Sequence, residues 1–442
     1  MVNDNSTVCV VGLGYIGLPT AALMASRGWK VIGVDTNAKV VETVALGEIH
    51  IVEPGLKELV QGAVSAGKLR TSNVPVSADV FVITVPTPLN AAKQPDCGFV
   101  VSAIRSIAPK LRAGNLVILE STCPVGTTAA MSDLIASMRP DLCVPSRSAL
   151  PDIHVAYCPE RVLPGRILIE LQENDRSIGG LSERCTERAV EFYETFVRGE
   201  CIGTTAAVAE TVKLSENAFR DLNIAFANEL SVICDRIGVD VWEVIELANH
   251  HPRVKILQPG PGVGGHCIAV DPWFLVHSAP DLSPLIRTAR EVNDGKADYV
   301  YQKAHRLLEE NRSEKLACLG LTFKPNIDDL RESPSLEIAE RLCGKFGQRV
   351  SIVEPNVTQL PRALADSGAR KITLEHALTS CAILLLLVDH DEFKQVSLEK
   401  LAGKKVIDTR GIWKVPTSSA SVGSRSNVRD FRLASTTGSA AG

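Results

Sequence analysis

The first part of the chain alternates short apolar runs with a helical pattern. Residues 7–11 and 30–35 form two apolar runs, and residues 17–27 between them have helical spacing. Apolar runs of this length are typical of strands that are buried in a sheet. The amino-terminal segment therefore predicts a strand–helix–strand unit.

Three more apolar runs follow, each with turn-forming residues directly after it. They lie at residues 79–85, 115–120 and 154–157. This spacing is typical of a parallel sheet with crossover helices, in which ligands bind beyond the carboxyl ends of the strands. We therefore expect the side chains that follow the runs to lie near one crevice, namely Thr87, Thr122 and Glu160.

A long helical segment divides the chain. Residues 204–237 contain neither proline nor glycine, and Gly238 follows them as a natural helix stop. Such a helix is about 50 Å long. We expect it to run through the middle of the molecule and to contribute to a homodimer interface.

The remaining chain returns to the α/β pattern before its composition changes. A helical pattern at residues 288–310 precedes four predicted strands, at residues 315–321, 348–353, 382–388 and 405–408. The predicted fold class is α/β, with two Rossmann-like doubly wound lobes joined by the long central helix and a helical middle domain.

Domain borders follow from these segments. We expect a cofactor-binding domain at residues 1–200, a central helical domain that forms the dimer at 201–310 and a substrate-binding domain at 311–415. Residues 416–442 are mostly Ser, Ala, Gly and Thr with little to bury, which predicts a disordered tail.

Composition narrows the class of protein. The 442 residues are 45% hydrophobic and 22% charged, with a net charge of −4. These values favour large cores and provide no basic surface for nucleic acid. The 12 cysteines include no Cys-x-x-Cys pair, which favours a reducing cytoplasm. No segment reads as a signal peptide or as a membrane span, so we expect a cytoplasmic protein without a membrane partner.

The turn after the first predicted strand carries the spacing G-x-G-x-x-G at residues 12–17. Glycine there permits a tight turn and lets a pyrophosphate approach the amino end of the next helix. Asp35 ends the second strand, where its carboxylate can accept hydrogen bonds from ribose hydroxyls and would repel a 2′-phosphate. The pattern favours NAD over NADP, while a glycine turn without a ligand is the alternative. The expected cofactor contacts are Gly12, Gly14, Tyr15, Ile16, Gly17 and Asp35.

One face of the long helix is polar. Lys213, Asn217 and Arg220 are spaced so that all three project from the same side. An ammonium and an amide one turn apart can stabilise a developing alkoxide. A solvated helix face is the alternative, and the helix alone does not decide between the two.

A glycine-dense loop places a cysteine close to an aspartate. Residues 259–265 contain four glycines and two prolines, and Cys267 and Asp271 follow. The missing side chains leave room for a bulky ligand near the thiol; a buried, inert cysteine is the alternative.

Zinc is not expected at this loop. His250 and His251 are adjacent, as are His266 and Cys267, and neither pair has the spacing by which chelating side chains converge. We expect no metal, and His251 and Arg253 are better suited to hold an anionic ligand.

The second lobe begins with a different turn. Its first strand leads into Gly320, with Lys324 and Arg331 further along. This turn has one glycine where the first lobe has three, which predicts a related fold for a different phosphate-bearing ligand. Ordinary surface charges are the alternative.

Six motifs in this order give the chain a family resemblance: GLGYIGLP, ESTCPVGTT, CPERVLPG, KLSENAFRDLNIAFANEL, NHHPRVKILQPGPGVGGHCIAVDPWF and GLTFKPNIDDLRESP. Over residues 7–412 the chain resembles the UDP-glucose/GDP-mannose dehydrogenase family. The resemblance implies an NAD-dependent, four-electron oxidation of the C6 hydroxymethyl group of a nucleotide sugar to a carboxylate, for surface polysaccharide synthesis, with two NADH per substrate.

The resemblance also assigns roles to residues. It implies that Cys267 is the nucleophile, that Lys213 is an acid/base or oxyanion partner, and that Asn217 and Asp271 assist. Glu160 and Thr122 would handle water and transition-state contacts. Thr87, Thr122 and Arg331 would contact the cofactor. Sugar-nucleotide contacts would come from Arg161, Val162, Lys213, Asn217, Arg220, His251, Arg253, Gly264, Phe323, Lys324 and Arg410.

The implied substrate is UDP-N-acetyl-D-mannosamine. Val270 departs from the lysine that many UDP-glucose dehydrogenases have before the aspartate, which favours an acetamido sugar over glucose. UDP-N-acetylglucosamine and UDP-glucose remain alternatives, because one residue can alter discrimination at C2. Rival classes are a single-step hydroxyacid-type dehydrogenase, which needs no cysteine, and a dinucleotide sensor without turnover.

Overall fold

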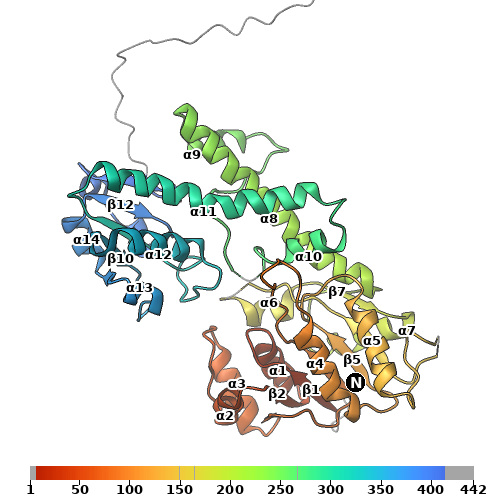
Figure 1. Cartoon of the computed structure of the whole chain (residues 1–442). Coiled ribbons are helices and arrows are strands. Elements are labelled where there is room, and N and C mark those ends of the chain that lie inside the picture. The colour runs from red at the N-terminus through yellow and green to blue at the C-terminus, as the bar shows by residue number, and fades with distance from the viewer. Residues whose placement is uncertain (1–5, 149, 164, 266, 414–442) are drawn as a thin grey trace, which may run out of the picture.

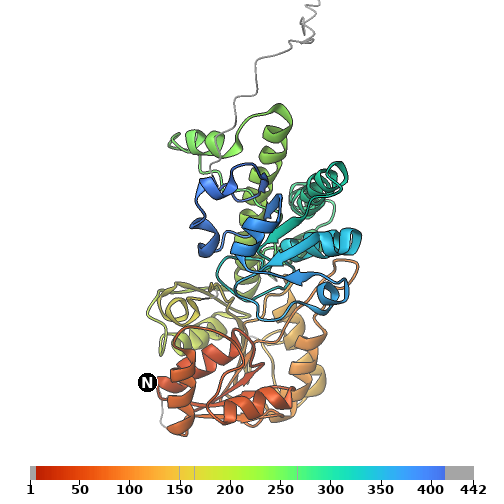
Figure 2. The same cartoon turned by 90° about the vertical axis from the view of Figure 1, so that its left-hand side faces the viewer.

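The computed structural model describes residues 6–148, 150–163, 165–265 and 267–413. The tail predicted at residues 416–442 and the side chain of His266 lie outside this range. Two α/β lobes and a helical middle between them are seen in both views of the chain (Figures 1 and 2). The predicted fold class is confirmed.

The amino-terminal lobe is an eight-stranded sheet in the order β3-β2-β1-β4-β5-β6-β7-β8. Every neighbouring pair is parallel except β6 and β7. The strands are β1 (Thr7–Val11), β2 (Lys30–Val34), β3 (Leu69–Ser72), β4 (Val80–Ile83), β5 (Leu116–Leu119), β6 (His154–Tyr157), β7 (Arg176–Gly180) and β8 (Cys201–Thr205).

Helices cover both faces of this sheet, so the central strands are buried throughout. They are α1 (Gly17–Ser26), α2 (Ala38–Ala45), α3 (Leu56–Ser65), α4 (Gly98–Ile107), α5 (Thr127–Met138), α6 (Ile167–Glu173) and α7 (Glu183–Tyr193). Leu18 and Leu56 of α1 and α3 pack in one core, and Ile104 and Ile135 of α4 and α5 pack in the other. Two-sided burial explains why these strands read as continuous apolar runs.

The middle of the molecule is built from the long helix and three further helices, namely α8 (Ala206–Ile237), α9 (Val241–Ala248), α10 (Asp271–Ser278) and α11 (Pro284–Glu310). The Thr205 hydroxyl accepts a hydrogen bond from Val208 N–H at the start of α8, and Gly238 ends the helix with φ +74°. Helix α11 begins four residues before the predicted position, because Pro284 supplies the fixed φ that suits a first helical residue.

The carboxyl-terminal lobe is a parallel five-stranded sheet in the order β11-β10-β9-β12-β13. Its strands are β9 (Leu316–Leu319), β10 (Val350–Val353), β11 (Arg370–Lys371), β12 (Ile383–Leu386) and β13 (Lys405–Asp408). Its helices are α12 (Pro334–Phe346), α13 (Arg362–Asp366), α14 (Leu374–Ser380) and α15 (Asp391–Lys394).

A buried carboxylate connects the long helix to the first sheet. Glu210 of α8 is fully buried and accepts hydrogen bonds from the N–H groups of Gly126 and Thr128, at 2.7 and 2.8 Å, and from the Thr128 hydroxyl at 2.6 Å. These groups form the amino end of α5, where unpaired N–H groups and the helix dipole favour an anion. The contact fixes α8 against the loop that follows β5.

We predict that Glu210→Ala destabilises the protein by about 2–4 kcal/mol, because it leaves the buried N–H and hydroxyl of Thr128 without an acceptor. A fall in Tm of roughly 2–5 °C is expected by calorimetry. Glu229→Ala, at an exposed position of the same helix, is the matched control. Equal Tm values for the two variants would contradict the prediction.

Candidate active site

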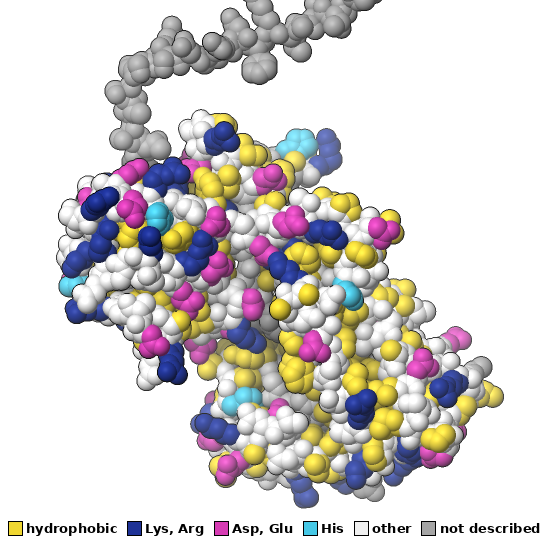
Figure 3. Space-filling model, viewed as in Figure 1, with side chains coloured by type: hydrophobic (Ala, Val, Ile, Leu, Met, Phe, Trp, Pro, Cys, Tyr) yellow, Lys and Arg dark blue, Asp and Glu magenta, His cyan; other side chains and the backbone are white. Residues whose placement is uncertain are grey.

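A cavity of about 1340 Å³ lies between the two lobes. The space-filling view shows a recess between the carboxyl-terminal and amino-terminal lobes (Figure 3). The cavity is lined by the turn after β1, by the residues after β4, β5 and β6, by α8, by the cysteine loop and by residues 330–340 of the second lobe. Of the predicted site residues, it is lined by Gly12, Gly14, Tyr15, Ile16, Asp35, Thr87, Thr122, Glu160, Val162, Lys213, Cys267, Asp271 and Arg331.

The glycine turn has the shape that a dinucleotide needs. Gly12 has φ +100°, and a Cβ on Gly17 would lie 1.8 Å from the Gly12 carbonyl oxygen, so neither position accepts a side chain. A Cβ on Gly14 would meet nothing within 4 Å, which leaves open space above the amino end of α1. The Asp35 carboxylate is held by the N–H groups of Leu13 and Asn37, at 2.9 and 2.8 Å. The arrangement fits the pyrophosphate and ribose of NAD.

The second lobe reaches over this turn. The Arg331 guanidinium lies 4.7 Å from the centre of the Tyr15 ring, and it also donates hydrogen bonds to the Asp329 carboxylate. A cation over an aromatic face is an attractive contact. Arg331 therefore lies beside the cofactor turn, where the sequence places it.

Cys267 lies among charged groups in the cavity. Burial raises the pKa of its thiol to about 11, and the Asp271 carboxylate adds to this effect. Lys213 and Arg331 act in the opposite direction by favouring the thiolate. The cysteine is therefore within electrostatic reach of the lysine and the aspartate that the sequence pairs with it.

The aspartate and the lysine are fixed by single strong contacts. Asn217 Nδ2 donates a hydrogen bond to Asp271 Oδ2 at 2.5 Å, so Asn217 reaches the site through the carboxylate. Burial raises the pKa of Asp271 to about 6, against the opposing effects of Lys213 and Asn217. The Lys213 ammonium donates to the Glu160 carbonyl oxygen at 2.6 Å.

The loops after β4 and β5 are tied together at the cavity. The Thr87 hydroxyl donates a hydrogen bond to the Thr122 carbonyl oxygen at 2.6 Å. Both threonines line the cavity close to the glycine turn. The expectation that residues after the strands share one crevice is met for Thr87, Thr122 and Glu160.

The loop after β9 packs against the cysteine loop. A Cβ on Gly264 would lie 2.7 Å from the Phe323 Cβ, and one on Gly265 would lie 2.9 Å from the Phe323 ring, so the glycines allow this close approach. A Cβ on Gly260 would lie 2.8 Å from the Arg410 guanidinium. The two loops are therefore in direct contact, although Gly264, Phe323 and Arg410 do not line the cavity itself.

The turn after β9 repeats the turn after β1. Gly320 N–H donates to the Val353 carbonyl oxygen at 2.8 Å, and Leu321 N–H donates to Glu354 at 2.7 Å, as Gly12 and Leu13 do with Val34 and Asp35 in the first lobe.

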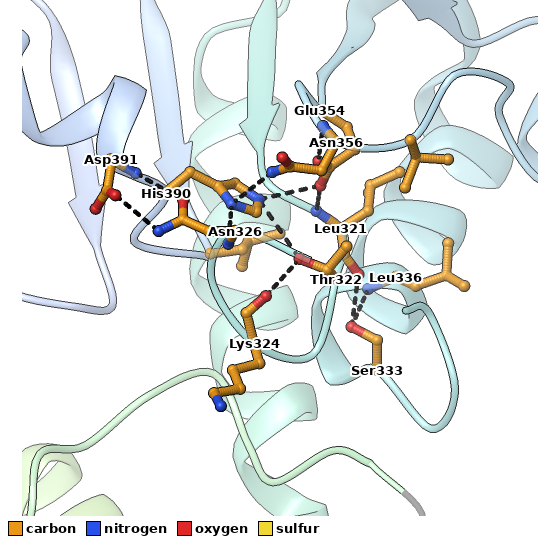
Figure 4. Close-up of polar contacts among 12 residues, drawn as sticks. Leu321, Thr322, Lys324, Asn326, Ser333, Leu336, Glu354, Asn356, His390 and Asp391 are labelled. Carbon is orange, nitrogen blue, oxygen red and sulfur yellow. Dashed lines mark hydrogen bonds and ion pairs between the residues drawn. The ribbon is translucent and has the colours of Figure 1, made fainter. Parts of the chain in front are cut away.

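The two turns differ in the side chain that contacts the carboxylate after the second strand of each lobe. Glu354 also contacts His390 Nε2 at 3.2 Å, while His390 Nδ1 accepts from Asn326 N–H at 3.0 Å (Figure 4). The imidazole thus lies beside the carboxylate that corresponds to Asp35. Lys324 points away from this network (Figure 4), and burial and the nearby Arg220 both lower the pKa of its ammonium.

Some predicted residues are not brought to the cavity. His251 and Arg253 are exposed in the loop after α9, and Arg161 forms an ion pair with Glu216 at 2.7 Å. Arg220 is exposed on α8, and Gly17 packs beneath the glycine turn. Within the described residues, no three or more His, Cys, Asp or Glu side chains come together as metal ligands would.

Glu120 is a cavity residue that the sequence reasoning missed. It directly follows β5, is 3% exposed and accepts a hydrogen bond from the Tyr193 hydroxyl at 2.6 Å. Burial raises the pKa of its carboxyl to about 7. A carboxylate at the end of an otherwise apolar strand was the available signal, because such a position opens onto the crevice.

A dinucleotide turn and a half-buried cysteine on the same cavity as a lysine define an NAD-dependent dehydrogenase. The chain belongs to the UDP-glucose/GDP-mannose dehydrogenase family. It matches the family's NAD binding domain at residues 6–197, its central domain at 207–295 and its UDP binding domain at 317–415. The predicted NAD cofactor and nucleotide-sugar dehydrogenase class are confirmed.

Several similar proteins are named as dehydrogenases of N-acetylated nucleotide sugars. The chain is 55% identical over 411 residues to an NDP-N-acetyl-D-galactosaminuronic acid dehydrogenase of Ralstonia nicotianae, covering 93% of this chain and 97% of that protein. It is 52% identical over 418 residues to the UDP-N-acetyl-D-mannosamine dehydrogenase of Escherichia coli K12, covering 92% and 99%. A solved UDP-D-ManNAc dehydrogenase from Pyrococcus horikoshii has a TM-score of 0.84 at 39% identity, covering 93% and 97%.

None of the described helices is both long and apolar enough to cross a membrane.

We predict opposite shifts in Cys267 reactivity when its two charged neighbours are changed. Asp271→Asn removes a negative charge and lowers the pKa of the thiol, whereas Lys213→Met removes a positive charge and raises it, each by roughly one unit. The pH dependence of iodoacetamide alkylation, followed by peptide mass spectrometry, measures both shifts. Cys143 serves as the internal reference, and shifts of the same sign would contradict the assignment.

Proposed function

We propose that this enzyme oxidises the C6 hydroxymethyl group of UDP-N-acetyl-D-mannosamine to the carboxylate, with two NAD consumed per substrate. The observation that carries the proposal is the presence of Cys267, Lys213 and Asp271 in the same cavity as the cofactor turn. The relatives named above favour an acetamido sugar. Because one relative is named for N-acetyl-D-galactosaminuronic acid, a nucleotide sugar with the galactosamine configuration is the main alternative substrate.

The cysteine accounts for the second oxidation. NAD, when bound, accepts a hydride in each of the two oxidations. The first oxidation gives an aldehyde, which is a poor hydride donor until the Cys267 thiolate bonds to its carbon and forms a thiohemiacetal. Loss of the second hydride leaves a thioester, which water hydrolyses to the carboxylate and the free thiol.

Charged neighbours of Cys267 stabilise these steps. We assign the stabilisation of the oxyanion that forms beside the sulfur to the Lys213 ammonium, which contacts the Glu160 carbonyl oxygen, and to the Asn217 amide, which contacts Asp271. Asp271 orients Asn217, and with a pKa of about 6 its carboxyl is mostly ionised at neutral pH and can hold a proton transiently. Glu160, next to Lys213, is placed to receive a proton from the attacking water.

A group of cations suits the diphosphate of the substrate. Lys324 of the second lobe lies near Arg220 of α8, and Arg410 lies beside Gly260 of the cysteine loop. Positive side chains on both sides of the loop can neutralise a diphosphate and direct the sugar toward Cys267.

A homodimer fits the surface of α8. Phe219, Phe226, Ile233 and Ile237 are 71%, 54%, 49% and 65% exposed, and their spacing of seven, seven and four residues puts them on one side of the helix. We infer that a second copy covers this stripe. The exposed His251 and Arg253 would then be available to the partner's cavity, which accounts for their distance from their own. Cytoplasmic location and a role in surface polysaccharide synthesis remain predictions.

We predict that the enzyme forms two NADH per UDP-N-acetyl-D-mannosamine and that Cys267→Ala lowers carboxylate formation by at least roughly a thousandfold, because the thiohemiacetal cannot form. NADH absorbance and product analysis by mass spectrometry measure both. UDP-N-acetylgalactosamine, UDP-N-acetylglucosamine and UDP-glucose are assayed in parallel. Faster turnover of another nucleotide sugar would show that the proposed substrate is wrong. Formation of one NADH per product, with full activity in Cys267→Ala, would contradict the proposed mechanism.

We predict that Phe226→Glu converts the dimer to a monomer, because a charge at the centre of an apolar interface is left without a partner. Light scattering coupled to size-exclusion chromatography measures the mass. Glu229→Gln, nearby on the same helix, is the control and is expected to stay dimeric. A monomeric wild-type protein would contradict the proposed homodimer through α8.

A further inference from the structure

A largely buried cluster of two carboxylates and a guanidinium lies at the wall of the cavity. Glu120, Glu160 and Arg176 are 3%, 8% and 4% exposed. Glu120 and Glu160 follow the adjacent parallel strands β5 and β6, and Arg176 begins β7. Neighbouring strand ends therefore bring the three groups together at the edge of the sheet.

Arg176 interacts electrostatically with both carboxylates. Its Nη1 lies 3.7 Å from Glu160 Oε2, and its guanidinium lowers the pKa of Glu120. Because Arg176 is shared with Glu160 and its effect on Glu120 does not outweigh burial, Glu120 holds a proton more readily than it would in water. The pKa of Glu120 is about 7, raised by burial and by Glu160 and opposed by Arg176 and the hydrogen bond from Tyr193.

Charged or titratable groups from α7, from β7 and from the end of β6 interact with Glu120. Tyr193 of α7 donates to its Oε1, while Oε2 accepts no hydrogen bond from the described residues. Arg176 and Glu160 face it from β7 and from the end of β6, and the buried Cys158 thiol completes the surroundings. The hydrogen bond from Tyr193 thus holds Glu120 in place through Oε1 and leaves Oε2 without a donor from the described part of the chain. The charge of Glu120 acts mainly on Arg176 and Glu160.

Glu160 in turn acts on the reacting sulfur. Its carboxylate is close enough to Cys267 to raise the pKa of the thiol, and its carbonyl oxygen accepts the Lys213 ammonium. A change in the charge of Glu120 therefore reaches Cys267 through one intervening residue.

We propose that Glu120 is a positioning residue that sets how strongly Glu160 attracts a proton during hydrolysis of the Cys267 thioester. This inference rests on the proposed function. In that step a water oxygen bonds to the carbonyl carbon and the carbon–sulfur bond breaks. The sulfur keeps the bonding electron pair and takes up one proton, and a second proton passes from the water to Glu160. When Glu120 is ionised, the positive charge of Arg176 is shared between the two carboxylates, and Glu160 attracts a proton more strongly. When Glu120 is protonated, Arg176 interacts with Glu160 alone, and Glu160 attracts a proton less strongly.

The test separates hydrolysis from the two oxidations. Full-length enzyme is mixed with NAD and UDP-N-acetyl-D-mannosamine between pH 5.5 and 8.5 and quenched in acid, and the acylated Cys267 peptide is followed by mass spectrometry. In the wild type, hydrolysis accelerates as the pH rises through about 7. In Glu120→Gln we expect this rise to disappear and the high-pH rate to fall roughly tenfold, while the acyl-enzyme forms at a rate within about twofold of the wild type.

Three further variants distinguish an effect of Glu120 on the proton affinity of Glu160 from a purely structural effect. Glu120→Asp restores the carboxylate and the rise with pH. Tyr193→Phe removes a hydrogen bond that lowers the pKa of Glu120, so the rise moves to higher pH by roughly one unit. Glu191→Gln, at an exposed position of α7, keeps the wild-type profile.

Several results would overturn the inference. One is a Glu120→Gln enzyme that keeps the rise near pH 7; another is equal slowing of acylation and hydrolysis. If Glu120→Gln does not fold, an unshifted profile in Tyr193→Phe has the same meaning. Absence of any acylated Cys267 in the wild type would reject the proposed function as well, whereas normal acylation with an unchanged variant profile rejects only the role of Glu120.

Discussion

The buried contact between Glu210 and the amino end of α5 is the constraint on which the geometry of the site depends. A carboxylate that is fully removed from water and satisfied by three donors tolerates little rotation or sliding of its helix. Lys213 and Asn217 follow one and two turns later on the same side of α8. The same contact that fixes the loop after β5, which carries Thr122, therefore also sets where the ammonium and the amide enter the cavity.

Much of the fold was predictable because two-sided burial leaves a strong signal in the sequence. Strands β1, β4, β5 and β6 are covered on both faces and read as apolar runs. Strands β7 and β8 were not predicted, and their sequences, RSIGG and CIGTT, contain glycines where the chain is crowded. A Cβ on Gly179 would lie 2.3 Å from the Thr205 carbonyl oxygen, so close backbone approach replaces side-chain packing there and removes the apolar pattern.

The site was predictable where function requires a particular residue type at a fixed spacing. The glycine turn, Asp35 and the loop around Cys267 are local in the sequence, and the structure places them on one cavity. Glu120 was missed because its importance depends on Arg176 and Tyr193, which are distant in sequence and lie in segments without a local signal. The exposed positions of His251 and Arg253 could not be foreseen either, since they depend on how the loop after α9 packs and not on a local sequence signal.

The two lobes share the hydrogen-bond pattern of the turn after their first strand, but they differ in what lies beside the carboxylate after the second strand. In the first lobe Asp35 lines the cavity, whereas in the second lobe His390 Nε2 lies 3.2 Å from Glu354. The Glu354 carboxylate is thereby engaged in contacts within the protein, with Leu321 N–H and with His390. Asp35, and not Glu354, is therefore the carboxylate of this kind that lines the cavity between the lobes.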